Sequence, residues 1–183
     1  MNIIKTDIEG PLIVEPRVFG DARGYFFESY SERDFAAATG LDIKFVQDNE
    51  SRSCYGVVRG LHFQLPPYAQ AKLVRVVEGS VLDVAVDLRH DSPTYGKHVA
   101  VELNAENKRQ FFVPRGFAHG FAVLSETAVF QYKCDEYYHP EAEGAIAWDD
   151  TTLAIDWCLP ADKVLLSEKD RHHPTFNQFT TPF

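Results

Sequence analysis

The sequence is short of cysteine, of positive charge and of long apolar runs, and each shortage excludes a class of protein. The three cysteines are an odd number without a CxxC pair, so we predict neither a disulfide framework nor a zinc clip, and we expect a reducing cytoplasm. Only 18 basic residues face 27 acidic ones, and this balance argues against a nucleic-acid partner. No stretch approaches the roughly 18 apolar residues of a membrane span. Charges near the N-terminus, at Lys5 and Asp7, also argue against a signal peptide, so we expect no membrane partner.

The composition is that of a globular protein. Hydrophobic residues make up 45% of the 183 residues, and 14 phenylalanines are among them, which is enough to bury a full core. No linker, low-complexity tract or repeat of fixed period interrupts the chain. We therefore expect a single domain over residues 1–183.

Short β-rich runs follow one another between single glycines and prolines, a pattern typical of a sandwich or closed barrel. The run from Val81 to Leu88 alternates with period two, and both of its faces are partly apolar. Such a strand belongs between two layers, so we predict an all-β fold of the double-sheet jelly-roll type with a few short peripheral helices. The predicted strands are Leu12 to Arg17, Gly24 to Tyr30, Gly56 to Leu61, Ala71 to Glu78, Ser80 to Leu88, His98 to Leu103, Gln110 to Val113, Gly120 to Val123 and Ala128 to Tyr137.

Two segments carry helix signals. Ser31 can cap the first turn, Asp34 stands at the third helical position, and Gly40 can adopt the left-handed end. After Pro160, residues 161–168 are predicted to form a closing helix.

Two motifs hold most of the chemical information, Gly56 to Gln64 and Val113 to Gly120. Together they resemble the cupin jelly roll, whose motifs run G-x5-H-x-H then E, and P-x-G-x2-H. Gln64 stands where the second ligand histidine belongs, and the glutamate of the first motif is absent, with Tyr68 and Ala69 at those places. Only His62 and His119 remain, whereas a divalent transition metal needs three or four ligands. We therefore predict that the ancestral metal site is empty.

His62 and His119 are the candidate functional histidines. Each follows a turn marked by glycine and has an arginine nearby, Arg59 or Arg115, and both motifs map to the same end of a cupin barrel. The other histidines lack such support and are interpreted as solvated or structural: His90, His98, His139, His172 and His173.

A wider resemblance, to the dTDP-4-dehydrorhamnose 3,5-epimerase family, covers nearly the whole chain. Several long motifs in the right order are far more specific than any one of them. The matching stretches are Pro16 to Glu28, Phe45 to Asn49, Val58 to Gln64, Gln70 to Arg75, Pro114 to His119, Tyr132 and Ser167 to Asp170.

The resemblance implies an isomerase that acts on dTDP-4-dehydro-6-deoxy-D-glucose in dTDP-L-rhamnose synthesis. Both C3 and C5 of this sugar flank the C4 ketone and bear acidified protons. Inverting them requires a base on one face, an acid on the other, and a cation where enolate charge develops. No cofactor is required.

By this resemblance, four residues carry the chemistry. His62 is the expected base, because imidazole titrates near the working pH, and Asp170 would orient its ring. Lys72 is the cation suited to the enolate oxygen, with His119 as a second donor. Alternation places Tyr132 on one face with Ala128, Phe130 and Cys134, and the family match makes it the general acid opposite His62.

The remaining candidates would bind the substrate. Diphosphate needs local cations, which the net charge does not exclude. Gln47, Asn49, Glu28 and Glu143 could hydrogen-bond the base or the sugar, and Tyr138, or else Phe19, would stack on thymine. The cation candidates are Arg23, Arg59 and Lys169. In the family the Arg23 to Glu28 segment lies in a strand exchanged between subunits, so the resemblance implies a homodimer.

Three other functions stay open at this point. The nearest is a relative in the same fold that inverts one carbon only, or isomerises the keto group, in another deoxysugar pathway. A metal-dependent cupin oxygenase and a sugar-nucleotide binding module without catalysis are the alternatives from other classes. Tyr132 favours the full reaction, because inversion at C5 needs an acid there.

Overall fold

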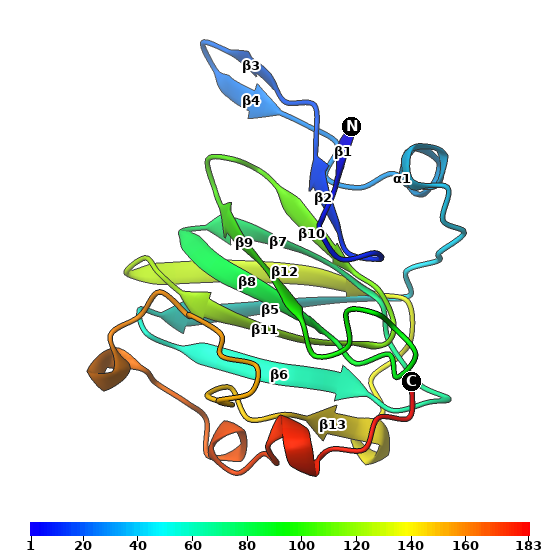
Figure 1. Cartoon of the computed structure of the whole chain (residues 1–183). Helices are drawn as coiled ribbons and strands as arrows, with labels where there is room; N and C mark the ends of the chain where they lie inside the picture. The colour runs from blue at the N-terminus through cyan, green and yellow to red at the C-terminus, as the bar shows by residue number, and fades with distance from the viewer.

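The computed structural model describes residues 1–183, and its strands form two antiparallel sheets that face each other (Figure 1). The six-stranded sheet has the order β1 (Asn2–Lys5), β2 (Leu12–Glu15), β10 (Gln110–Val113), β7 (Lys72–Glu78), β12 (Thr127–Cys134) and β5 (Gln47–Cys54). The five-stranded sheet has the order β13 (Glu143–Ala145), β6 (Val58–Gln64), β11 (Phe117–Val123), β8 (Ser80–Asp87) and β9 (His98–Asn104). The predicted double-sheet jelly roll is confirmed.

A third, small sheet stands apart from the two large ones. It is a hairpin of β3 (Phe19–Asp21) and β4 (Gly24–Phe26), and Figure 1 shows it projecting past β1 and β2, away from the two large sheets. Its large side chains are exposed, with Phe26 at 66% of its full accessible surface.

Strand β8 shows how the two layers are built. The interpretation of its two apolar faces is confirmed, because each face packs into a different cluster. Val81 and Ala85 point into the core between the sheets. The opposite face packs against the outer layer through Leu82, Val84, Val86 and the following Leu88. Burial of each such side chain contributes about 1.5–3 kcal/mol, so this central strand anchors both layers.

The space between the sheets changes from apolar to polar along the strands. Phe130 on β12 and Val74 on β7 are completely buried in the inner core. Farther along the same strands come Tyr132 and Lys72, whose side chains are only partly buried. Because side chains alternate across a strand, these residues keep the inward direction. One end of the barrel is therefore filled, and the other is lined by polar groups.

Helix α1 (Glu32–Thr39) lies beside β1 and β2 in Figure 1, and it packs on the outer side of the six-stranded sheet. The Ser31 hydroxyl accepts a hydrogen bond from the Asp34 amide, and Gly40 ends the helix with a φ of 74°, so the predicted caps are confirmed. Phe35 is buried and meets Phe112 edge to face at 5.7 Å.

The predicted helix over residues 161–168 is wrong. The structure has only short 3-10 turns there, η2 (Ala161–Lys163) and η3 (Lys169–Arg171), with η1 (Pro140–Ala142) and η4 (Phe176–Gln178) elsewhere. Leu165 is extended because its backbone pairs with the start of β6: its amide donates to Gly56 and its carbonyl accepts from Val58. The C-terminal segment thus covers the outer face of the five-stranded sheet as irregular chain.

None of the helices combines the length and apolar character needed to cross a membrane.

Candidate active site

A cavity opens between the two sheets at the polar end of the barrel. Its volume is about 710 Å³ including the open mouth, within the range of small-molecule sites. The residues that line it are Gln47, Asn49, His62, Phe63, Gln64, Gln70, Lys72, Tyr132, Cys134, Tyr138 and Glu143. The candidates that the motifs placed in widely separated parts of the sequence therefore meet around one cavity.

His62 is held by a buried carboxylate. Its Nε2 atom lies 2.6 Å from Asp170 Oδ1, and Asp170 is only 4% exposed. The Ser167 hydroxyl donates to the other carboxylate oxygen at 2.7 Å. Burial alone would raise the pKa of Asp170, but the hydrogen bonds from His62 and Ser167 outweigh it and hold that pKa well below its usual range. Asp170 is thus an anion that fixes the His62 ring and leaves Nδ1 free of protein hydrogen bonds.

Strand β6 positions His62 through a close contact with β11. His62 lies opposite His119 in the pairing of the two strands, and the register shifts between His119 and Phe121. Gly60 has a φ of +122°, and a Cβ at this position would lie 2.6 Å from the Gly120 Cα atom. Only glycine permits this approach, which explains the glycine before the histidine in the motif.

Tyr132 and Lys72 face the cavity from the other sheet. Tyr132 lies on β12 opposite Asn49 on β5, and Lys72 lies on β7 opposite Cys134. The Lys72 Nζ atom is 6.0 Å from the centre of the Tyr132 ring. The Tyr132 hydroxyl and the Lys72 ammonium make no hydrogen bond to the protein. Neither group is completely buried, so each can be reached from the cavity. Both polar groups are therefore available to a ligand.

The surroundings of these two groups shift their protonation in opposite directions. Burial raises the pKa of Tyr132, and the neighbouring Cys134 acts in the same direction, so the phenol keeps its proton at neutral pH. Burial lowers the pKa of Lys72, while Cys134, Asp83 and Glu143 oppose that change. The site thus offers one proton donor and one poorly hydrated cation on the same wall.

His119 does not line the cavity. It is buried on β11, and its Nε2 atom lies 2.9 Å from Asp83 Oδ1 on β8. Burial raises the pKa of Asp83, whereas His119 and Lys72 oppose that rise. Asp83 of this second imidazole–carboxylate pair interacts electrostatically with Lys72. The pair therefore influences the charge of Lys72 without contacting the cavity itself.

A polar network forms one rim of the cavity. Glu143 accepts a hydrogen bond from the Tyr138 hydroxyl at 2.9 Å and forms an ion pair with Lys169. On the opposite side, the Gln47 amide donates to Asn49 Oδ1 at 3.0 Å, and Gln47 Oε1 accepts from the Tyr138 backbone. Tyr138 is more than half exposed, so its ring forms an accessible flat surface at the mouth.

Besides Asp170, His119 and Lys169, which are described above, three predicted site residues do not line the cavity in the single chain. Arg23 is exposed in the β3–β4 turn and pairs with Asp21 at 2.6 Å. Glu28 is exposed beside Arg17 and Phe19. Arg59 on β6 donates to the Ser53 hydroxyl at 3.0 Å and is close enough to Tyr132 to favour its ionised form.

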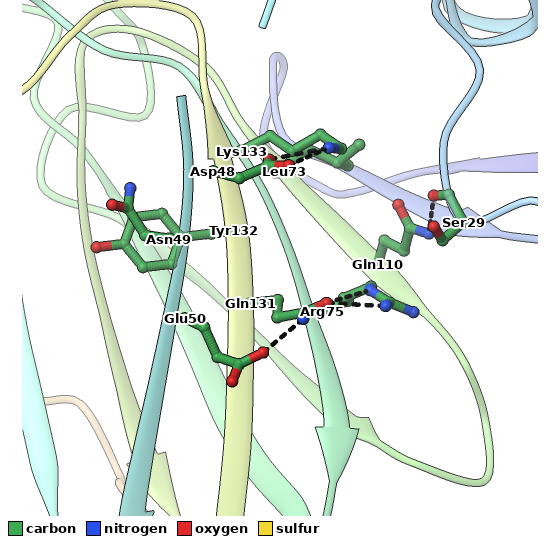
Figure 2. A pocket seen from close by; sticks show the side chains of 10 residues that line it. All are labelled: Ser29, Asp48, Asn49, Glu50, Leu73, Arg75, Gln110, Gln131, Tyr132 and Lys133. Carbon is green, nitrogen blue, oxygen red and sulfur yellow. Dashed lines mark hydrogen bonds and ion pairs between the residues drawn. The ribbon is translucent and has the colours of Figure 1, made fainter. Parts of the chain in front are cut away.

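Figure 2 shows a second pocket, on the outer side of the six-stranded sheet. Tyr132 and Asn49 point to one side of β12, toward the barrel, while Lys133 and Arg75 point to the other. Polar groups of this outer pocket bond to one another: Lys133 pairs with Asp48 at 2.9 Å, and Gln131 bonds to both Arg75 and Glu50. Because its charged side chains already have hydrogen-bond partners in the protein, the outer pocket is less suited to catalysis than the inner cavity.

Gln64, at the place of a cupin metal ligand, forms hydrogen bonds with the loops at the mouth of the cavity. Its amide donates to the Tyr68 and Tyr137 carbonyls, and its oxygen accepts from the His139 backbone. The side chain at this position therefore connects loops.

His173 is a site residue that the sequence interpretation missed. We interpreted it as solvated or structural, yet its Nε2 atom lies 3.2 Å from Asp170 Oδ1. The only sequence signal is its position three residues after Asp170, which has no meaning until the local turn is known.

Comparisons with known proteins agree on one family. The family model described as dTDP-4-dehydrorhamnose 3,5-epimerase matches residues 5–178. The enzyme of that name from Shigella flexneri is 56% identical over 170 residues, which is 93% of each chain. The crystal structure of the enzyme from Elizabethkingia anophelis NUHP1 is 57% identical, covers 97% of each chain and has a TM-score of 0.93. The dTDP-6-deoxy-D-glucose-3,5-epimerase from Legionella pneumophila Philadelphia 1, in complex with dTDP-4-keto-L-rhamnose, is 51% identical with a TM-score of 0.94, over 98% of this chain and 94% of that one.

Proposed function

The chain belongs to the dTDP-4-dehydrorhamnose 3,5-epimerase family, and from that premise we propose that its cavity inverts C3 and C5 of dTDP-4-dehydro-6-deoxy-D-glucose. The product is dTDP-4-dehydro-L-rhamnose, and the enzyme is an isomerase. The observation that carries the proposal is that His62, on β6 of one sheet and 2.6 Å from Asp170, shares a cavity with Tyr132 and Lys72 from the other sheet.

His62 acts as the base in this proposal. Because Asp170 holds Nε2, the free Nδ1 atom takes the proton from the carbon next to the ketone. The C–H electron pair moves toward the carbonyl, and negative charge develops on the C4 oxygen. Asp170 stabilises the imidazolium that forms, as carboxylates do in other histidine pairs.

Lys72 stabilises the charge on the C4 oxygen. Its ammonium is partly desolvated and has no hydrogen bond to the protein, so it reaches a developing anion without first losing a partner. In a site of low dielectric such a cation contributes more than it would in water.

Tyr132 returns a proton from the other side. Its raised pKa keeps the phenol protonated until the carbanion forms. Proton removal by one wall and delivery by the opposite wall produces inversion. Each event leaves His62 with one extra proton and Tyr132 with one fewer, and the open mouth lets solvent restore both before the second carbon reacts.

The nucleotide part of the substrate is assigned to the mouth. The Tyr138 ring is placed to stack on thymine, and Gln47, Asn49 and Glu143 offer hydrogen bonds around it. Lys169 and Arg59 are the proposed phosphate contacts from the same chain.

We also propose a homodimer whose exchanged segment brings Arg23 and Glu28 to the partner's cavity. The support is the β3–β4 hairpin, whose aromatic side chains Phe19, Tyr25 and Phe26 are exposed in the single chain. An apolar patch of this kind marks an interaction surface. The three cysteines are free, which supports a reducing compartment such as the cytoplasm.

The reaction is tested by incubation with the dTDP-4-keto sugar in heavy water. We expect deuterium at both C3 and C5, and none at either carbon with His62→Asn, while the exposed His90→Asn control behaves as the wild type. Deuterium at one carbon alone would instead assign the protein to single-carbon epimerisation. Exchange that persists in His62→Asn would remove His62 as the base.

The dimer is tested by mixing two inactive variants, Arg23→Ala and His62→Asn. If each cavity uses the partner's Arg23, a mixed dimer contains one intact site. Subunit exchange should then restore about a quarter of the wild-type activity. A wild-type monomer by light scattering, or no recovery on mixing, contradicts the exchanged arrangement.

A further inference from the structure

A second imidazole, that of His173, lies against the carboxylate of the proposed base pair. Its Nε2 atom is 3.2 Å from Asp170 Oδ1, the same oxygen that His62 contacts at 2.6 Å. The two imidazole rings meet edge to face, with centroids 5.7 Å apart and an interplanar angle of 89°. The His173 side chain is 10% exposed, so solvent cannot replace it freely.

The chain around His173 is fixed by hydrogen bonds on its C-terminal side, so the position of His173 beside Asp170 is well defined. The carbonyl of the next residue, Pro174, accepts a hydrogen bond from Ala147 at 2.8 Å. Two residues later, the Phe176 amide donates to the buried Asp150 carboxylate at 2.7 Å. Thr175 and Gln178 then form a reciprocal cap on η4.

The shared carboxylate fixes the tautomers of both rings. An ionised carboxylate only accepts hydrogen bonds, so the Nε2 atoms of His62 and His173 must both carry hydrogens. The lone pair of a neutral His62 ring then lies on Nδ1, the atom that the base needs. Two donors on one oxygen also compete, so His173 weakens the hold of Asp170 on His62. A second positive charge on this oxygen would be repelled by the first.

We infer that His173 is a positioning residue for the proposed reaction, which shares Asp170 with His62, fixes the carboxylate and keeps the His62 ring neutral between turnovers. This inference rests on the proposed function. His173 does not line the cavity and is not a catalytic residue itself.

Apart from Asp170, the titratable groups around His62 form no hydrogen bond or ion pair with His173. They are Glu143 on β13, Lys72 on β7, Tyr132 on β12, Tyr138 at the mouth and Lys169 on η3. Glu143 is balanced by Tyr138 and Lys169. A difference between the wild type and a His173 variant therefore isolates the effect of the second imidazole on the pair.

A metal ion is the competing explanation of this cluster. The donor atoms of His62, Asp170 and His173 lie within 4.8 Å of one another. The 2.6 Å and 3.2 Å separations are those of hydrogen bonds. Two ligands of a tetrahedral zinc ion, each at about 2.0–2.1 Å from the metal, would stand about 3.3 Å apart. The 2.6 Å separation of His62 and Asp170 is too short for two such ligands, so this closer contact favours a proton between the atoms.

The test compares His173→Phe, which keeps an aromatic ring without a donor, with His173→Gln, which keeps an N–H donor. His172→Phe is the matched control, because His172 is exposed and pairs only with Glu168. In His173→Phe we expect the acid limb of kcat/KM to move to higher pH by about half a unit to one unit. Above that limb the rate stays within about twofold of the wild type. His173→Gln restores the wild-type profile, and His172→Phe leaves it unchanged.

A measurement without substrate separates this inference from the proposed function. NMR of protein with ¹⁵N-labelled histidine follows protonation of the His62 ring directly, and we expect the same shift in His173→Phe. An unmoved His62 titration, or an equal loss of rate at every pH, overturns the inference. A wild-type profile that changes when EDTA is added assigns the cluster to a metal and overturns it as well. If His173→Phe does not fold, a displaced titration in His173→Gln contradicts the sharing of Asp170.

Discussion

Replacing Asp170 by asparagine removes one charge from the proposed base pair with almost no change in shape. The carboxylate accepts from His62 and His173 on one oxygen and from Ser167 on the other. An asparagine oxygen in place of Oδ1 preserves the contacts with both rings, and its amide can donate to the Ser167 hydroxyl. The variant therefore keeps most hydrogen bonds but loses the anion that stabilises the imidazolium.

The size of the loss follows from the charge separation. Two unit charges about 4 Å apart attract by about 4 kcal/mol at an effective dielectric constant near 20. His62 is 30% exposed, and solvent reduces this attraction, so we expect about 2–4 kcal/mol. Since 1.36 kcal/mol changes a rate tenfold, kcat should fall about 30- to 1,000-fold. KM should change little, because Asp170 does not line the cavity.

The assay is deuterium incorporation at C3 and C5, measured over a range of substrate concentrations. Ser167→Ala is the matched control, because it removes one hydrogen bond from Asp170 but keeps the charge, and we expect a loss below about tenfold. A fall of less than threefold in Asp170→Asn, or a rise in KM with kcat unchanged, would refute the electrostatic role of Asp170.

Stability gives a second, independent readout of the same substitution. Because the pKa of Asp170 is lowered in the folded protein, its stabilising contribution is present above the unfolded value of about 3.9 and is lost as the pH falls through the folded value. The difference in unfolding free energy between wild type and Asp170→Asn should therefore shrink, by about 1 kcal/mol, as the pH falls from about 5 to about 3. Urea unfolding at about pH 5 and about pH 3 checks this, and a difference that stays constant or grows over that range contradicts it.

Three further substitutions test the other proposed roles. Tyr132→Phe should reduce inversion far more than deuterium exchange, because proton removal by His62 does not need the phenol; an equal fall in both would make Tyr132 a substrate-positioning residue. Lys72→Met should lower kcat about 100- to 1,000-fold and leave the melting temperature unchanged or higher, because it removes a partly desolvated charge; a retained kcat would exclude Lys72 from enolate stabilisation. Arg59→Ala should raise KM for the nucleotide sugar without lowering kcat, and an unchanged KM would contradict its contact with phosphate.

The elements that the sequence predicted best are those whose signal is local or strictly periodic. Strand β8 alternates apolar residues on both faces, and α1 has a capping residue at each end. Strand β5 escaped prediction because its side chains are almost all polar, and it is held by pairing with β12 rather than by an apolar face. The predicted closing helix is wrong because Leu165 forms backbone hydrogen bonds with β6, a contact that no local pattern announces.

Only those site residues that lie in recognisable sequence motifs could be predicted from the sequence. The contact between His62 and Asp170, implied by the family resemblance, is confirmed at 2.6 Å across a separation of 108 residues. No motif pointed to His173, because its contact with Asp170 depends on the 3-10 turn η3, which brings the two side chains together. Asp83 was likewise interpreted only as one position on an alternating strand, and its pairing with His119 depends on the register of β8 against β11.

The two-sheet architecture explains why a cupin-type barrel suits an inverting reaction. Under the proposed roles the base lies on β6 of one sheet, and the acid lies on β12 of the other. A flat sugar ring between the sheets presents one face to each wall. If both groups lay on one sheet, a proton would return to the face that it left, and configuration would be retained. Because residues alternate along each strand, moving Tyr132 by one position would place the phenol outside the barrel, as Figure 2 shows for its neighbour Lys133. Strand register is therefore the property that couples this fold to inversion.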